Sequence, residues 1–188
     1  MNIKELLQAK DISKQELEVI FRTSNSADEL FDAFRIAINS RVNDPEFYKT
    51  LLWNKALSTD EILMFAEKIC REFPEIKYSI YYSAGQIFSS ISFYGKHLDK
   101  AMNCFKKAAE SKPGTSDPYL AVLKMYNHEL NVPRLEDIIS MVQAGLETVD
   151  KKSLLCMEIS SFYKKLGNKE KERIYRKLGE KYQKEEND

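Results

Sequence analysis

The residue types that most often carry catalysis are few and far apart in this sequence. The chain has two histidines, His97 and His128, and three cysteines, Cys70, Cys104 and Cys156. Nucleophilic catalysis needs a serine or cysteine beside a base and an orienting acid, and a metal site needs ligands at short characteristic spacings. No HExxH, GxSxG or glycine-rich phosphate-binding motif occurs. The sequence therefore predicts a protein that is not an enzyme, with no catalytic, cofactor-binding or metal-ligating residues.

Two acidic pairs, Asp28-Glu29 and Asp60-Glu61, have a structural explanation instead. Each follows a serine that can begin a helix, so each pair falls in a first helical turn. The helix dipole stabilises negative charge at that position. These carboxylates are therefore predicted to stabilise helices and not to act as general acids.

Charge and cysteine usage narrow the classes of partner and compartment. The chain carries 29 basic and 29 acidic residues, with a mild excess of acid before residue 76 and of base after it. Nucleic-acid binding draws most of its affinity from basic residues, so a nucleic-acid partner is not expected. The odd number of cysteines gives no disulfide framework. No apolar run is long enough for a membrane span, and the N-terminal MNIKELLQAKD lacks a signal core. We expect a cytoplasmic protein.

Capping signals divide the chain into short helices. Three serines stand three residues before a glutamate, as in a capping box, and two aspartates precede a proline. These signals are Ser13-x-x-Glu16, Ser26-x-x-Glu29, Ser58-x-x-Glu61, Asp44-Pro45 and Asp117-Pro118. They predict helices near 2–9, 13–22, 26–41, 45–55, 59–73, 75–94, 97–112, 118–129, 134–149, 151–166 and 168–185. The short connections predict that successive helices pack antiparallel.

Within these segments apolar residues recur every three or four positions, as one buried helical face requires. Strand-like alternation is absent from them. The clearest stripes are Leu30, Phe31, Phe34, Ala37 and Ile38; Ile62, Phe65, Ala66, Ile69 and Phe73; and Leu98, Ala101, Met102, Phe105, Ala108 and Ala109. The fold class is therefore predicted to be all-α.

A spaced pattern also recurs along the chain at a period of about 35 residues. Its copies are Ala84-x-x-Ile87-Phe88-x-x-Ile91, Tyr119-x-x-Val122-Leu123-x-x-Tyr126 and Cys156-x-x-Ile159-Ser160-x-x-Tyr163. This spacing resembles the first-helix signature of the tetratricopeptide repeat (TPR) family. Ala101-x3-Phe105, with Ala108 and Pro113, resembles the second-helix signature. The resemblance covers residues 80–180, weakens over 44–79 and is missing before residue 44.

The TPR resemblance implies a short right-handed α-solenoid of antiparallel helix-pair repeats. Residues 44–188 would form the TPR-like repeats and end in a capping helix near 168–185. Residues 1–43 would form N-terminal helices, either a divergent repeat or a docking element. Residues 6–17 also faintly resemble the helical arm of biotin-synthase-like radical enzymes, but the cysteine triplet of those enzymes is missing.

In TPR proteins the concave face is lined by fixed positions of each first helix. Carried onto this chain, the peptide-binding residues are Leu51, Asn54, Lys55, Ser89, Phe93, Leu120, Lys124, Asn127, His128, Met157, Ser161, Lys164 and Lys165. Lysines and asparagines among apolar positions would suit a peptide or helix that carries carboxylates. Alternatively, the lysines only solvate an unused face.

The resemblance favours a protein–protein interaction module, a scaffold or adaptor that binds a partner protein. Three alternatives remain open at this point: a chaperone that shields a client helix, an RNA-binding protein that uses its basic second half, and a helical domain associated with an enzyme.

Overall fold

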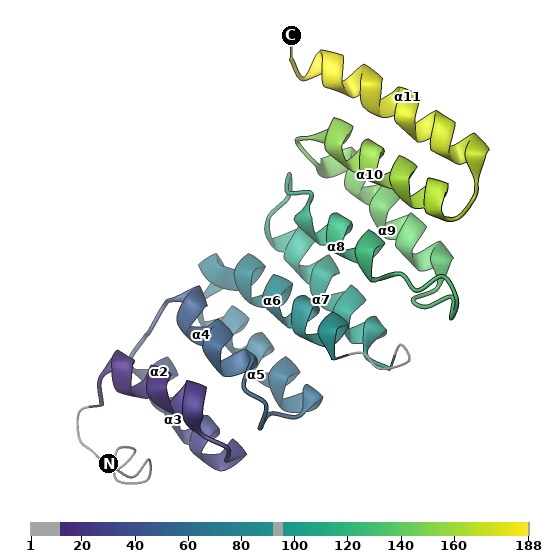
Figure 1. The fold of residues 1–188 in the computed structure, drawn as a ribbon. Coiled ribbons are helices and arrows are strands. Elements are labelled where there is room, and N and C mark those ends of the chain that lie inside the picture. Colours follow the sequence, from purple (N-terminus) through teal and green to yellow (C-terminus); the bar gives the residue numbers. More distant parts are fainter. Residues whose placement is uncertain (1–11, 92–95, 188) are drawn as a thin grey trace. The chain divides into compact units, whose positions relative to one another are not determined.

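The computed structural model describes residues 12–91 and 96–187, and the regular structure of this part is helical (Figure 1). The all-α prediction is therefore confirmed. The helix predicted near 2–9 lies outside the described residues. The elements are α2 (Lys14–Thr23), α3 (Ala27–Asn39), α4 (Pro45–Leu52), α5 (Thr59–Glu72), a 3-10 turn η1 (Pro74–Ile76), α6 (Lys77–Ser90), α7 (Leu98–Ser111), α8 (Asp117–Met125), α9 (Leu135–Thr148), α10 (Lys152–Lys165) and α11 (Lys169–Glu185).

Four of the five predicted caps begin helices as expected. Ser13 and Ser58 form complete capping boxes with Glu16 and Glu61. Ser26 accepts a hydrogen bond from the backbone of Glu29, and Asp44 accepts from those of Glu46 and Phe47. Asp117 differs, because it is the first residue of α8 and Ser116 occupies the capping position without a side-chain bond.

The helix predicted over 118–129 ends early, at Met125. Beyond it, the backbones of Asn127 and Val132 exchange two hydrogen bonds, and the side-chain oxygen of Asn127 accepts from the N–H of Leu130. Asn131 adopts a positive φ of 51°, which asparagine tolerates better than most residues. Local bonds of this kind compete with helical ones, so a tight turn replaces the last helical turn.

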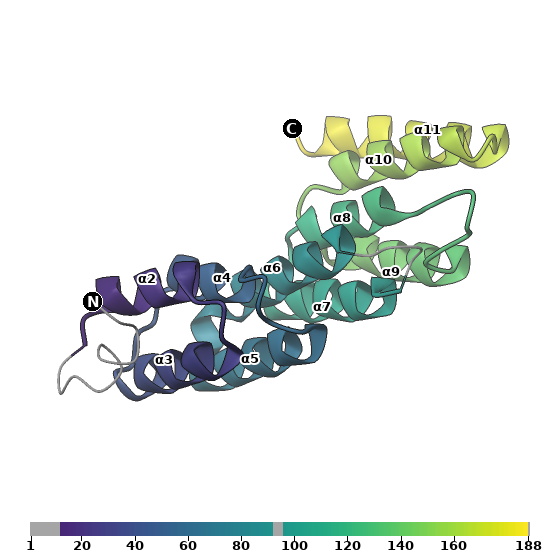
Figure 2. The same cartoon turned by 60° about the horizontal axis from the view of Figure 1, so that its bottom comes forward.

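The chain divides into two compact units, Met1–Ile87 and Phe88–Asp188. In the first unit, α2 packs against α3 and α4, and α4 packs against α5. Figure 2 shows α2 and α4 in one layer, with α3 and α5 in the other. The predicted division after residue 43 falls inside this unit, and the roles predicted for its two parts remain predictions.

In the second unit, α8 contacts α7, α9 and α10, and α10 packs along α11. Phe105 is buried in its core. Two glycines permit close helix approach, since Gly145 lies against the Tyr119 ring and Gly179 against Met157. Among the described residues, no helix combines the length and apolar character needed to cross a bilayer.

Candidate protein-binding surfaces

The predicted concave-face residues of the second unit are mostly exposed. On α8, Lys124 is exposed and Leu120 is half-buried. On α10, which packs against α8, Met157 is 43% exposed. Ser161, Lys164 and Lys165 of the same helix are exposed as well. Leu154, one turn before Met157 on α10, is 41% exposed. The two helices therefore present lysines and two large apolar side chains to solvent.

The remaining predicted residues of the second unit are placed less simply. Asn127 and His128 are exposed, but they belong to the turn after α8 and not to the helix. Ser89 is half-buried near the end of α6. Phe93 lies outside the described residues.

Three of the residues predicted to bind a peptide lie in the first unit, and two of them contribute to its packing and hydrogen bonding. Leu51 has no exposed surface. The Asn54 side-chain amide donates to the carbonyls of Phe21 (2.8 Å) and Ser24 (3.0 Å). Because α4 ends at Leu52, the helical offset behind the prediction does not extend to position 54. Lys55 is exposed, and Asn54 is half-buried.

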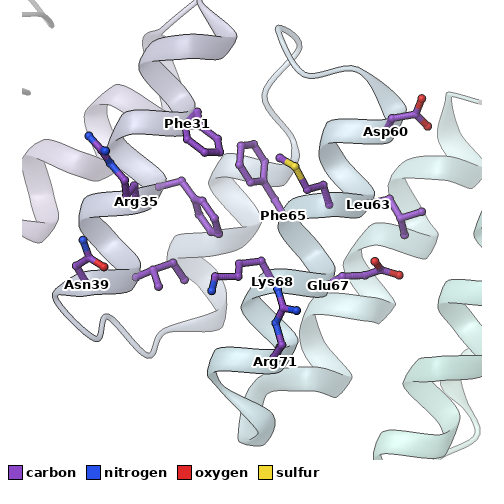
Figure 3. A pocket seen from close by; sticks show the side chains of 12 residues that line it. Phe31, Arg35, Asn39, Asp60, Leu63, Phe65, Glu67, Lys68 and Arg71 are labelled. Carbon is purple, nitrogen blue, oxygen red and sulfur yellow. The ribbon is translucent and has the colours of Figure 1, made fainter.

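A groove of about 720 Å³ lies elsewhere in the first unit, between α3 and α5 (Figure 3). Its residues recur every three or four positions on each helix, as facing stripes of two helices should. We call it the α3–α5 groove. It is lined by Phe31, Phe34, Arg35, Ile38 and Asn39 of α3, and by Asp60, Leu63, Met64, Phe65, Glu67, Lys68 and Arg71 of α5.

Aromatic rings form the floor of the α3–α5 groove. The Phe65 ring centroid lies 4.5 Å from that of Phe34 and 6.3 Å from that of Phe31. Phe34 and Phe65 are buried, whereas Phe31 is 48% exposed and Met64 is 46% exposed. Phe31 was predicted to belong to the buried stripe of its helix, but it is half-exposed and its ring lies against Phe65 of α5. The groove therefore offers two large apolar side chains to solvent.

The floor rests on a fully packed aromatic core. Tyr48 lies edge-on to Phe34, with ring centroids 6.3 Å apart, and also packs against Phe47 and Phe73. Burial raises the pKa of the Tyr48 hydroxyl far above its usual value, and the nearby Glu72 carboxylate adds to this shift. The side chains beneath the groove are thus held in place and shielded from water.

The charges along the groove differ in whether they are neutralised nearby. The Arg35 guanidinium lies 3.3 Å from Asp32, and the Lys68 ammonium lies 2.7 Å from Glu72. The hydrogen bond from Lys68 holds the pKa of Glu72 below its usual value. Arg71 is exposed, and among the described residues it makes no hydrogen bond or close ion pair, although its charge contributes weakly to lowering the pKa of Glu72.

Two smaller hollows lie in the second unit. One, of about 560 Å³, lies between α7 and α9 beside Met102, Met141 and Tyr119. The other, also about 560 Å³, includes the predicted residue His128 and lies beside Tyr126 and Tyr163. Neither combines two strongly exposed apolar side chains with an unpaired charge, so neither matches the α3–α5 groove as a docking surface.

The groups that sequence reasoning excluded from catalysis are placed as follows. The three cysteines are buried, and burial raises the pKa of the Cys156 thiol to about 11. A thiol of raised pKa is a poor nucleophile at neutral pH. Within residues 12–91 and 96–187, no three histidine, cysteine, aspartate or glutamate side chains gather as metal ligands would.

The α3–α5 groove was missed because the TPR resemblance directs attention to the first helix of each pair. A usable signal was present in the apolar stripes. A helix buried on one side needs a limited apolar arc, and Phe31 and Met64 widen that arc on α3 and α5.

Comparison of the chain with models of protein families, with characterised proteins and with solved structures finds no match.

Proposed function

We propose that this chain is a non-enzymatic protein-interaction module, a scaffold or adaptor that binds an apolar segment of a partner protein in the α3–α5 groove. The observation that carries the proposal is the exposure of Phe31 and Met64 beside a floor of buried aromatic rings. Exposed apolar groups gathered in a groove are typical of protein-binding sites. Large anchors in such a site supply most of the binding energy.

The proposed architecture is a TPR-like solenoid. In the first unit, α2, α4 and α6 begin 31 and 32 residues apart, at Lys14, Pro45 and Lys77. In the second unit, α8 and α10 begin 35 residues apart and pack together, each followed by a partner helix. The interval from the start of α6 at Lys77 to that of α8 at Asp117 is longer, at 40 residues. These intervals support helix-pair repeats of similar but variable length, which suit a binding role because stacked repeats build extended surfaces.

A second surface of the same module would be the exposed α8–α10 face predicted from the repeat register. Lys124, Lys164 and Lys165 give this face positive charge, and Met157 offers an apolar contact. It would suit an acidic peptide. We place the principal site in the groove because Phe31 and Met64 line a single hollow of about 720 Å³ there.

Affinity capture with matched variants tests the proposal. Wild-type protein and the variants Phe31→Lys, Ile174→Lys and Lys124→Glu are incubated with extract from the source cells, and bound proteins are identified by mass spectrometry. Ile174 of α11 is 53% exposed and lies outside the groove, so Ile174→Lys is the control for placing a lysine at an exposed apolar site.

We expect a discrete protein that binds the wild type, Ile174→Lys and Lys124→Glu but not Phe31→Lys. Micromolar affinity, roughly −8 kcal/mol, would be ordinary for such a groove. Loss with Lys124→Glu alone would place the principal site on the α8–α10 face. Equal recovery with all four proteins would reject both surfaces.

A further inference from the structure

The apolar and charged groups of the α3–α5 groove are separated along its length. Figure 3 shows Phe31 and Asp60 at one end of the groove, and Asn39 and Arg71 at the other. Met64, the second exposed apolar side chain, precedes Arg71 by seven residues on α5. At 1.5 Å per residue, this places about 10 Å between the apolar end and the Arg71 end.

The spare positive charge of the groove lies at the Arg71 end. Arg35 and Lys68 have partner carboxylates on Asp32 and Glu72, neither of which lines the groove. Arg71 lacks an ion pair within the described part of the chain. The Arg71 charge acts on Glu72 only at longer range, where it contributes to lowering the pKa of that carboxyl. A carboxylate that reaches Arg71 therefore gains a direct contact without breaking an existing hydrogen bond or close ion pair.

The walls of the groove favour a helical occupant over an extended one. The backbone groups of α3 and α5 are bonded within their own helices, and the floor consists of phenylalanine rings. An extended peptide would have to bury N–H and C=O groups against these rings, with Asn39 as the nearest side-chain amide. A helix satisfies its own backbone and can place apolar side chains between two helical stripes.

We propose that the α3–α5 groove binds an amphipathic helix of a partner protein that places apolar side chains over Phe31 and Met64 and a carboxylate, about two turns away, at Arg71. The inference rests on the proposed interaction function and adds the chemistry and register of the ligand. A helix can satisfy this pattern in either chain direction. The proposal therefore states which end of the groove takes the apolar side chains and which takes the carboxylate, and leaves the direction of the bound helix open.

Synthetic peptides test this register directly. Fluorescein-labelled helical peptides of about 18 residues carry two leucines one turn apart and, about two turns further on, two glutamates. In the matched peptides, glutamine or lysine replaces both glutamates. Their Kd values are measured by fluorescence anisotropy with the wild type, Arg71→Glu and Arg176→Glu. Arg176 is an exposed residue of α11, outside the groove.

We expect the wild type to bind the glutamate peptide about fivefold more tightly than the glutamine peptide, as one exposed charge pair of favourable geometry allows, with the lysine peptide weakest. Arg71→Glu should reverse the order of the glutamate and lysine peptides, whereas Arg176→Glu should preserve it. A reversal produced equally by both variants would indicate general charge steering and overturn the register.

Failure of the register and failure of the interaction function give different results. If the three peptides bind the wild type equally, and Phe31→Lys abolishes all binding, then the groove binds the peptides but Arg71 does not recognise a carboxylate. If no peptide binds and Phe31→Lys captures the same proteins as the wild type, both proposals fail. If sedimentation shows a dimer that Phe31→Lys dissociates, the occupant is a second copy and the proposed partner helix is rejected. Circular dichroism of each variant confirms that its helices are intact.

Discussion

Tyr48 places a hydroxyl group in the apolar core of the first unit, where it has no hydrogen-bond partner among the described residues. A buried polar group without a partner costs about 1–3 kcal/mol. Tyr48→Phe removes the hydroxyl and keeps the ring that packs against Phe34, Phe47 and Phe73. We expect this substitution to raise the free energy of unfolding by about 1 kcal/mol in urea titrations.

Tyr119→Phe is the matched control for Tyr48→Phe. The Tyr119 hydroxyl lies 3.4 Å from the hydroxyl of Thr148 and so has a partner. Its removal should give no gain in stability. A loss of stability with Tyr48→Phe would mean that the hydroxyl has a partner, such as a buried water, and would contradict the interpretation.

Asn54 is the predicted ligand-binding residue whose role changes most in the structure. Its amide joins the end of α2 to the loop after α4 through the carbonyls of Phe21 and Ser24. Asn54→Ala should lower the free energy of unfolding by about 1–3 kcal/mol, because both carbonyls lose this donor. The neighbouring exposed Lys55→Ala should change it by less than about 0.5 kcal/mol. Thermal or urea unfolding distinguishes the two, and equal small effects would return Asn54 to the list of candidate binding residues.

At the scale of helices, the contact between α8 and α9 depends on Gly145. A Cβ at this position would lie 2.7 Å from the Tyr119 ring. In an open helix, Gly→Ala stabilises by up to about 1 kcal/mol. Here the added Cβ would meet three carbons of the aromatic ring, which must move as a whole, so we expect Gly145→Ala to destabilise by about 1–3 kcal/mol.

Gly179 provides the comparison for Gly145. Its added Cβ would first meet the sulfur of Met157, at 2.9 Å, and Met157 is a flexible, half-exposed side chain that can move. Gly179→Ala should therefore cost less than Gly145→Ala when both are measured by urea unfolding. The reverse order would show that the α10–α11 contact is the tighter of the two.

Helix positions followed from local sequence, and the proposed binding surface did not. The serine and aspartate caps at positions 13, 26, 44 and 58 act within one helical turn, so sequence alone locates them. The end of α8 depends on the turn around Asn127 and Asn131, where side-chain and backbone bonds compete with the helix. Whether Phe31 is core or surface depends on how far α5 extends over α3. That depends on tertiary packing, which the spacing of apolar residues along the sequence does not predict.

At the scale of the whole molecule, acid should destabilise the fold through a small set of carboxylates. Hydrogen bonds lower the pKa of each one, with the largest contribution from a serine or lysine side chain. They are Glu16, Asp44, Glu61, Glu72 and Glu186. A lowered folded-state pKa contributes stability above the unfolded value of about 4, and this contribution is lost as pH falls through the folded value.

We therefore expect the urea midpoint to be nearly constant from pH 7 to about 5 and to fall steadily below about 4.5. Ser58→Ala removes the hydroxyl that lowers the pKa of Glu61, so this variant should be less stable at pH 7 and show a weaker pH dependence. A wild-type midpoint that stays constant down to pH 3 would show that these hydrogen bonds do not contribute to folding.

The distribution of the three buried cysteines gives the molecule a built-in reporter of local opening. Cys70 belongs to the first compact unit, while Cys104 and Cys156 belong to the second, and none is more than 1% exposed. An aromatic disulfide reagent can modify each thiol only after the surrounding helices separate. Peptide mapping after timed labelling would thus give an opening rate for each unit without an added probe. One common rate would mean that the two units open as a single cooperative body, and two rates would mean that one can open while the other stays folded.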